Sequence, residues 1–152
     1  MSNEHKKKKI ILLADDDQDD CFIFQEALSE VNIETELTIT KDGEQLMETL
    51  DQTVPPIPDV IFLDLNMPRK NGMECLSEIR SSHKLKEIPV VIFSTSHNQQ
   101  TVNEMYELGA NYYICKPNDF LKLKNVLQTV LSLPNQLMIS QPGREQFFLT
   151  NV

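Results

Sequence analysis

Five short apolar runs alternate with amphipathic segments along this 152-residue chain, and the alternation limits the folds that it can adopt. The runs predict strands over residues 10–14, 36–40, 60–63, 90–93 and 112–115. The first, third and fourth are continuously apolar and rich in Ile and Val, which is typical of strands covered on both faces of a parallel sheet. The second carries Glu36, Thr38 and Thr40, so we expect it at an edge of the sheet.

Segments with the 3.6-residue apolar period of a helix separate these runs. They predict helices over residues 19–32, 44–50, 72–81, 99–108 and 119–131. Short connections between parallel strands require right-handed crossovers, which place helices on both sides of the sheet. We therefore predict one α/β domain, a doubly wound five-stranded parallel sheet with helices on both faces (flavodoxin-like).

The chain divides into three parts around this domain. Residues 1–8 form a basic N-terminal tail, residues 9–133 the domain, and residues 134–152 a C-terminal extension that is too short for a separate output domain. The apolar side chains of Phe147, Phe148 and Leu149 are unusual for a disordered tail. They suggest that the extension docks on its own domain or crosses to a second copy, and a homodimer through the extension is a hypothesis.

Charge and hydropathy exclude several classes of protein. The formal net charge of −9 argues against a nucleic-acid binder, which needs a basic face. No apolar stretch approaches the roughly 20 residues that span a bilayer, so we expect no membrane insertion. There is no signal-peptide pattern, and the three cysteines lack metal-ligand spacing. We expect reduced thiols, at least two of them in the core, and a cytoplasmic protein.

Polar side chains follow four of the predicted strands. Asp15 and Asp16 follow the first, Asp64 ends the third, Ser94 ends the fourth and Lys116 follows the fifth. The carboxyl ends of parallel strands share one edge of the sheet, where such folds place their sites. Clustered carboxylates favour a bound cation, and oxygen-only ligands suit Mg²⁺. The ammonium and the hydroxyl could neutralise a transferring phosphoryl group, with the central Asp64 as its acceptor.

The run "DDDQDD" contains more aspartates than this chemistry uses. We assign Asp15 and Asp16 to the site. We expect Asp17, Asp19 and Asp20 to begin the first helix, where a capping oxygen and negative charge are favourable.

The sequences "ADD", "LDLNMP", "FST" and "CKP", each at the end of its strand, resemble the receiver domain of bacterial two-component response regulators. The resemblance covers about residues 8–133 and is to the stand-alone, chemotaxis-regulator-like type. It implies a signalling protein that is not a metabolic enzyme. Asp64 would accept a phosphoryl group, in the presence of Mg²⁺ (or Mn²⁺), from a sensor histidine kinase or a histidine phosphotransfer protein, and an unidentified downstream protein would respond.

The resemblance also implies roles for individual residues. Asp16, Asp64 and the main-chain carbonyl of Asn66 would bind the metal, with Asp15 acting through a water. Ser94 and Lys116 would contact the phosphoryl oxygens. The peptide bond between Lys116 and Pro117 is expected to be cis.

Two further roles concern signalling and lifetime. Ser94 would move toward the new phosphate and open space for Tyr113, remodelling the face formed by the fourth helix, fifth strand and fifth helix. Tyr113 as an ordinary half-buried aromatic is the alternative. Asn66 and Ser96 would control the access of hydrolytic water, and neither is bulky or charged, so we expect dephosphorylation that is not strongly suppressed.

Three other interpretations remain open at this point. Asp15, Asp17, Asp19 and Glu26 match positions of a calcium-binding EF-hand loop, although Asp20 stands where that loop needs glycine. A haloacid-dehalogenase-type phosphohydrolase would use Asp15 as its nucleophile, but the chain offers no cap segment. A receiver-like binding module that is never phosphorylated is the third.

Overall fold

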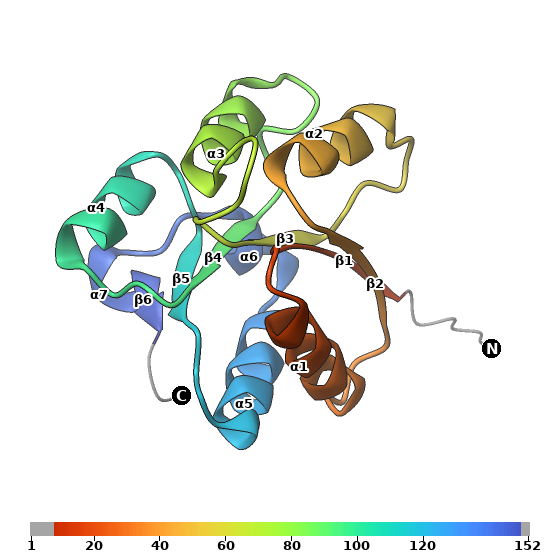
Figure 1. Ribbon diagram of the computed structural model, residues 1–152, viewed down its shortest axis with the longest axis vertical. Helices are drawn as coiled ribbons and strands as arrows, with labels where there is room; N and C mark the ends of the chain where they lie inside the picture. Colours follow the sequence, from red (N-terminus) through yellow and green to blue (C-terminus); the bar gives the residue numbers. More distant parts are fainter. Residues whose placement is uncertain (1–7, 150–152) are drawn as a thin grey trace.

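The computed structural model describes residues 8–149 and contains one parallel sheet of six strands in the order β2-β1-β3-β4-β5-β6 (Figure 1). The strands are β1 (Lys9–Ala14), β2 (Thr35–Thr40), β3 (Val60–Leu63), β4 (Val90–Ser94), β5 (Tyr112–Cys115) and β6 (Phe148–Leu149). The five predicted strands are confirmed to within one residue at each end, and β2 lies at the edge as expected. The sixth strand was not predicted.

Helices cover both faces of the sheet, as the short crossovers require. They are α1 (Gln18–Ser29), α2 (Gly43–Gln52), α3 (Gly72–Ser81), α4 (Gln99–Glu107), α5 (Phe120–Leu131), α6 (Asn135–Ile139) and α7 (Arg144–Phe147). Figure 1 shows α1 and α5 on one face and α2 and α3 on the other, with α4 beside the β5 end. The sheet therefore separates two hydrophobic clusters, one under α1 and α5 and one under α2, α3 and α4.

The start of α1 is fixed by the acidic run. Asp17 is the N-cap residue, and its carboxylate accepts the backbone amide of Asp20 at 2.9 Å. Asp19 and Asp20 fill the first turn, where negative charge interacts favourably with the helix dipole. The predicted helix-starting role of these three residues is confirmed. Because Asp17 caps α1, the preceding loop with Asp15 and Asp16 lies at the carboxyl ends of the strands.

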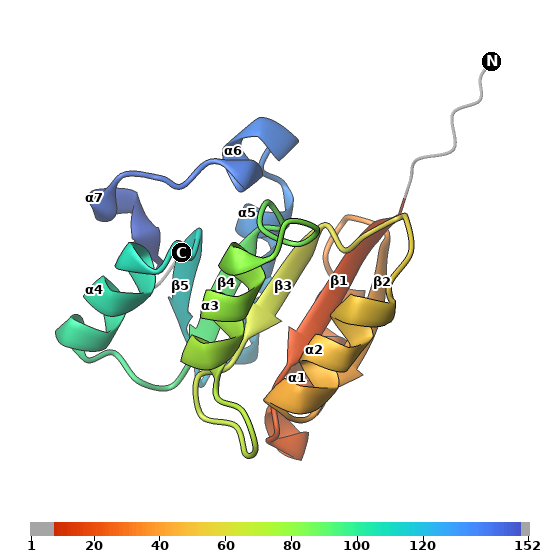
Figure 2. The ribbon, with the colours of Figure 1, turned by 90° about the horizontal axis from the view of Figure 1, so that it is seen from above.

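The C-terminal extension packs on its own domain instead of trailing from it. Phe147 is 2% exposed and joins the cluster under α2, α3 and α4, while Met138 joins the cluster under α1 and α5. β6 pairs in parallel with β5, with Phe148 opposite Tyr113. Figures 1 and 2 place α7 and β6 at the β5 end of the sheet, next to α4. A two-residue strand is too short to show a period, which explains why the sequence did not reveal it.

The remaining expectations about the chain concern its cysteines and its membrane relation. Cys21 and Cys75 are buried and Cys115 is partly buried, and all three are free thiols, so the core prediction is confirmed for two of them. Within residues 8–149, no helix combines the length and the apolar character that a bilayer crossing needs. Most of the predicted basic tail, residues 1–7, and the last three residues, 150–152, lie outside the described part.

Candidate functional site

The sheet brings the four strand ends to one level. The backbone amide of Asp64 donates to the carbonyl of Ala14 at 2.9 Å, and that of Lys116 donates to the carbonyl of Ser94 at 2.8 Å. These bonds continue the parallel ladders β1–β3 and β4–β5 by one residue. The side chains that follow the strands, including Asp15, therefore meet at the carboxyl edge, as predicted.

Three carboxylates converge there. Asp15, Asp16 and Asp64 each offer an oxygen, and these oxygens all lie within 4.8 Å of one another. Asp15 and Asp64 are buried, whereas Asp16 is exposed. The pKa of Asp64 is raised to about 6, mainly by burial and also by Asp15, while Lys116 and the backbone amide of Asn66 act in the opposite direction. The cluster is thus held together against its own repulsion.

The ammonium of Lys116 neutralises part of this charge. Its Nζ lies 2.8 Å from Oδ2 of Asp15, 2.7 Å from Oδ2 of Asp20 and 3.4 Å from Oδ2 of Asp64. Burial lowers the pKa of this ammonium, but the three carboxylates raise it more, so that its pKa lies above the ordinary value. Lys116 is therefore charged throughout the physiological range.

Asp20 is the residue of this site that the sequence argument missed. It was assigned only to the start of α1, yet it makes the shortest of the three contacts with Lys116. The signal was available in the run "DDDQDD", because the first turn of a helix that starts at this edge of the sheet faces the strand ends.

The donor set fits a hard divalent cation. Oδ2 of Asp15 is buried and receives no well-aligned hydrogen bond, although the ammonium lies 2.8 Å away. A buried acceptor without a well-aligned hydrogen bond is costly, so this oxygen has a lone pair that a cation could use. Carboxylate oxygens at this spacing are the ligands that Mg²⁺ and Mn²⁺ prefer.

The predicted switch residues lie next to one another. Ser94 is fully buried, and its Oγ accepts the amide of Ser96 at 3.2 Å. The hydroxyl of Tyr113 donates to the carbonyl of Ser96 at 2.8 Å. Tyr113 is fully buried, not half-buried, because the rings of Phe147 and Phe148 lie 6.3 and 5.5 Å from its own. The extension thus reaches the second of the two predicted switch residues.

The two residues expected to control hydrolytic water also share one location. Asn66 and Ser96 line a small hollow together with Leu65 and Thr101. Asn66 follows Asp64 by two residues, and Ser96 follows Ser94 by two, so the hollow lies between the loops that continue β3 and β4.

Two expectations are wrong. The peptide bond between Lys116 and Pro117 is trans; within the described residues the cis bond is the one between Pro55 and Pro56. Trans is the favoured isomer before proline by about 0.5–1 kcal/mol, and the sequence alone does not override that preference. The calcium-loop interpretation fails because Asp17 is used as a helix cap and Glu26 lies within α1, exposed.

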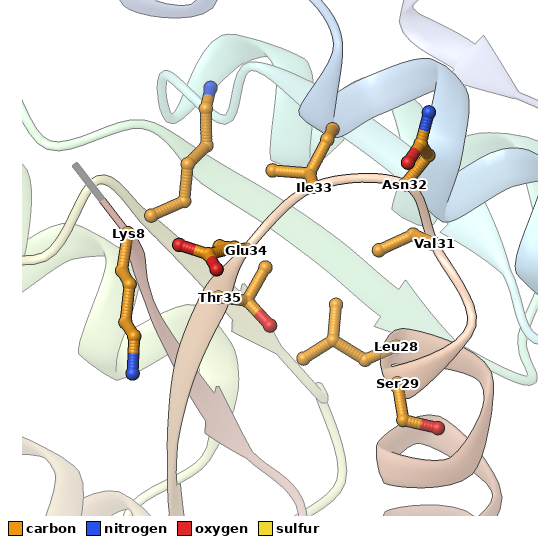
Figure 3. Close-up of a pocket in the computed structure, with 9 residues that line it drawn as sticks. Lys8, Leu28, Ser29, Val31, Asn32, Ile33, Glu34 and Thr35 are labelled. Atoms are coloured by element: carbon orange, nitrogen blue, oxygen red, sulfur yellow. The ribbon is translucent and has the colours of Figure 1, made fainter. Parts of the chain in front are cut away.

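A second hollow lies at the opposite edge of the sheet, around the loop from α1 to β2 (Figure 3). Its volume is about 860 Å³, and Val31, Ile33 and Glu34 are among the residues that line it. Glu34 supplies its one carboxylate, and Lys8 and Lys9 are also among its lining residues. It therefore lacks the convergent acids of the strand-end cluster, where the chemistry is concentrated.

Comparison with known proteins agrees with this geometry. The family model of the response regulator receiver domain matches residues 11–128, and the chain belongs to this family. Response regulator Rcp1 of Synechocystis sp. is 40% identical over 136 residues, which are 87% of this chain and 92% of Rcp1. The protein is therefore a receiver domain of two-component signalling and not a metabolic enzyme, which sets aside the phosphohydrolase interpretation.

Solved structures of relatives share the fold. The phosphorylated cyanobacterial phytochrome response regulator RcpA is 37% identical, with a TM-score of 0.75, over 82% of this chain and 91% of RcpA. The Mn²⁺-bound form of Rcp1 is 38% identical, with a TM-score of 0.74, over 89% of this chain and 99% of Rcp1. The flavodoxin-like prediction is confirmed, with β6 as an addition to the expected five strands.

Proposed function

We propose that Asp64 accepts a phosphoryl group from a phosphohistidine on a sensor histidine kinase or a histidine phosphotransfer protein. The observation that carries this assignment is the position of its buried carboxylate. Asp64 directly follows the central strand β3, between the acids that follow β1 and the ammonium that follows β5. Its carboxylate has Asp15 and Asp16 as acidic neighbours and lies 3.4 Å from the ammonium of Lys116.

The transfer is a displacement at phosphorus. An oxygen of Asp64 forms the new bond, the bond between phosphorus and the imidazole nitrogen breaks, and that nitrogen keeps the electron pair and takes up a proton. Asp64 reacts as the carboxylate, so its pKa of about 6 leaves it mostly ionised at pH 7. Lys116 and the hydroxyl of Ser94 contact the phosphoryl oxygens and stabilise their charge.

The residues that would hold the cation are Asp16, Asp64 and the main-chain carbonyl of Asn66, with Asp15 acting through a water. When bound, Mg²⁺ or Mn²⁺ supplies positive charge that the phosphoryl oxygens require. The fit of the acidic cluster to a hard cation supports this set.

Signalling follows from the contacts around Ser96. Ser94 and Tyr113 both bond to its backbone, so a shift of Ser94 toward the phosphoryl group is transmitted to Tyr113. Asn66 and Ser96 leave hydrolytic water access to the site, and we expect a phosphoryl lifetime well short of many hours. The domain comprises residues 9–133, with residues 134–152 as its extension.

The partner is inferred from the relatives. RcpA is described as a phytochrome response regulator, and its likeness to this chain supports a phytochrome-type histidine kinase as the phosphoryl donor. Free thiols at Cys21 and Cys75 support a cytoplasmic location. A homodimer through the extension stays a prediction. Deletion of residues 134–152 that leaves the oligomeric state in solution unchanged would contradict it.

Intact mass spectrometry tests the assignment. The protein is incubated with Mg²⁺ and acetyl phosphate beside Asp64→Asn and Asp19→Asn, the latter an exposed carboxylate with the same change of charge. One added phosphoryl group is expected in the wild type and in Asp19→Asn, and none in Asp64→Asn or without Mg²⁺. If the wild type gains no group and binds no beryllofluoride, the domain signals without phosphate, which is the third interpretation above.

A further inference from the structure

Lys116 contacts a carboxylate that belongs to no part of the proposed phosphoryl chemistry. Asp20 lies in the first turn of α1, and its Oδ2 is 2.7 Å from Nζ of Lys116. The lysine side chain is 8% exposed and that of Asp20 is 32% exposed, so the contact is partly shielded from water. An ion pair in such a place interacts more strongly than one on the surface.

Helix capping does not explain this contact. Asp19 occupies the same first turn and supplies the same charge to the helix dipole, but its carboxylate makes no ion pair with a lysine or arginine of the described chain. Asp17 already provides the capping oxygen. The position of Asp20 opposite Lys116 is therefore a feature of the site and not a requirement of α1.

An ammonium has three N–H donors, and here three carboxylates surround it. Two of the contacts are short, to Asp20 at 2.7 Å and to Asp15 at 2.8 Å, while the third, to Asp64, is 3.4 Å. The contact with Asp15 includes no well-aligned hydrogen bond, whereas Asp20 accepts one N–H of the ammonium at 2.7 Å and Asp64 accepts another at 3.4 Å. With one N–H fixed by Asp20, the tetrahedral nitrogen keeps a second N–H directed toward Asp64. That is the place where a phosphoryl group on Asp64 would present its oxygens.

Asp20 differs from the other two partners in one respect. Asp15 and Asp64 belong to the acidic triad, whereas Asp20 does not. Among the described residues it is thus the carboxylate that can serve Lys116 alone. Its contact does not depend on what the triad binds.

We propose that Asp20 is a positioning residue, which accepts one N–H of the Lys116 ammonium so that a second N–H faces the phosphoryl group on Asp64. This inference rests on the proposed function of Asp64. It predicts that the charge of Asp20 favours phosphoryl binding through Lys116, although the carboxylate itself is negative. Simple repulsion between Asp20 and the phosphoryl group predicts the opposite sign.

The probe is beryllofluoride, a phosphoryl mimic, titrated calorimetrically at saturating Mg²⁺ into the full chain. The variants are Asp20→Asn, the conservative Asp20→Glu, and Asp19→Asn as the matched loss of one charge in the same helical turn. Asp20→Asn is expected to bind about five- to tenfold more weakly, because a charge-assisted hydrogen bond is replaced by a neutral one. Asp20→Glu should recover most of the affinity, and Asp19→Asn should bind like the wild type.

The Lys116→Met background separates positioning from other effects. If Asp20 acts through Lys116, adding Asp20→Asn to Lys116→Met changes the affinity no further, and the two substitutions are non-additive. Tighter binding by Asp20→Asn, or an equal loss with and without Lys116, would overturn the proposal. Urea unfolding without metal of the wild type, Asp20→Asn, Lys116→Met and the double variant should show the same coupling between Asp20 and Lys116, independently of any phosphoryl chemistry.

The wild-type titration separates the two proposals. If the wild type binds beryllofluoride and Asp20→Asn binds it equally well, the positioning role is wrong and the acceptor role of Asp64 stands. If the wild type binds none, the acceptor role fails and the positioning role fails with it.

Discussion

The carboxyl edge of the sheet and the C-terminal extension each bury a side chain almost completely, but burial has opposite effects on stability in the two regions. Asp64 is 5% exposed at the edge, and Phe147 is 2% exposed in the extension. Burial raises the pKa of the carboxylate, which means that the fold holds its charge at a cost. Burial of the phenyl ring removes apolar surface from water and stabilises the fold. Burial of the site carboxylate therefore lowers the stability of the fold, whereas burial in the extension raises it.

The two regions also differ in how they are attached. The site is assembled from loops that follow neighbouring strands, so the sheet itself fixes it. The extension is held by individual contacts. The carboxamide of Asn111 donates to the carbonyl of Met138 at 2.9 Å, and the amide of Gln141 donates to the carbonyls of Tyr106 and Ala110 at 2.7 and 2.8 Å. Substitutions in the two regions should therefore change stability with opposite signs.

The largest effect is expected at Phe147. Phe147→Ala removes a buried ring that contacts Tyr106 and Tyr113, and should lower the free energy of unfolding by about 3–5 kcal/mol. Urea denaturation followed by circular dichroism measures this. Phe22→Ala, at a ring that is 63% exposed, is the control and should change stability by about 0.5 kcal/mol or less. Equal effects of the two substitutions would show that the extension does not pack as described.

Asn111 hydrogen-bonds the extension to the domain, and its substitution should cause the second-largest loss of stability. Its Oδ1 accepts from the amide of Val90 at 2.9 Å and from Arg80 at 2.8 Å, while its Nδ2 reaches α6. Asn111→Ala leaves these buried groups without partners and should lower the free energy of unfolding by about 2–3 kcal/mol. Hydrogen exchange should show additional opening at α6. A loss confined to the domain, with α6 unchanged, would mean that the carboxamide does not hold the extension.

Substitution of Asp64 should change the free energy of unfolding in the opposite direction, making the protein more stable. The pKa of Asp64 is about 6 in the folded protein and 3.8 for an aspartate free of such surroundings, so between those values the folded state keeps a proton that the unfolded state has lost. Stability therefore falls as the pH rises from about 4 to about 6. Asp64→Asn should remove this fall and raise the free energy of unfolding at pH 7 without metal by about 1–3 kcal/mol.

Urea unfolding of wild type and Asp64→Asn across pH 4–8 in chelator is the measurement, and Asp19→Asn provides the control for loss of one negative charge. A variant that is less stable than the wild type at pH 7 would contradict the cost assigned to the site. Added Mg²⁺ should narrow the difference by stabilising the wild type.

The smallest effect is expected at Tyr106. Its hydroxyl donates to the carbonyl of Pro142 at 2.8 Å, and its ring packs on Phe147 and beneath Arg144. Tyr106→Phe removes the hydrogen bond and keeps the ring, so thermal unfolding should report a loss of about 1 kcal/mol. A loss as large as that of Phe147→Ala would show that the hydrogen bond, and not the packing, holds the extension.

The sequence predicted the site and the extension unequally. Continuous Ile and Val runs mark buried parallel strands, and parallel strands align their carboxyl ends, so Asp15, Asp64, Ser94 and Lys116 could be placed together from order alone. Asp20 was missed because its helix-starting role already accounted for it. β6 was missed because two residues show no period, and its place depends on rings that meet only after folding.

The short strand β6 also changes how the sheet ends. Without it, β5 would present its backbone N–H and C=O groups to any other exposed strand, and open edges of this kind promote aggregation. With it, the sheet ends in only two paired residues, Phe148 and Leu149, which offer little length for further pairing. The opposite edge, β2, is a continuous six-residue strand that carries the exposed polar side chains of Glu36 and Thr38. The extension thereby shortens the strand that is open to intermolecular β-pairing at one end of the sheet, and trimming it would expose β5 there.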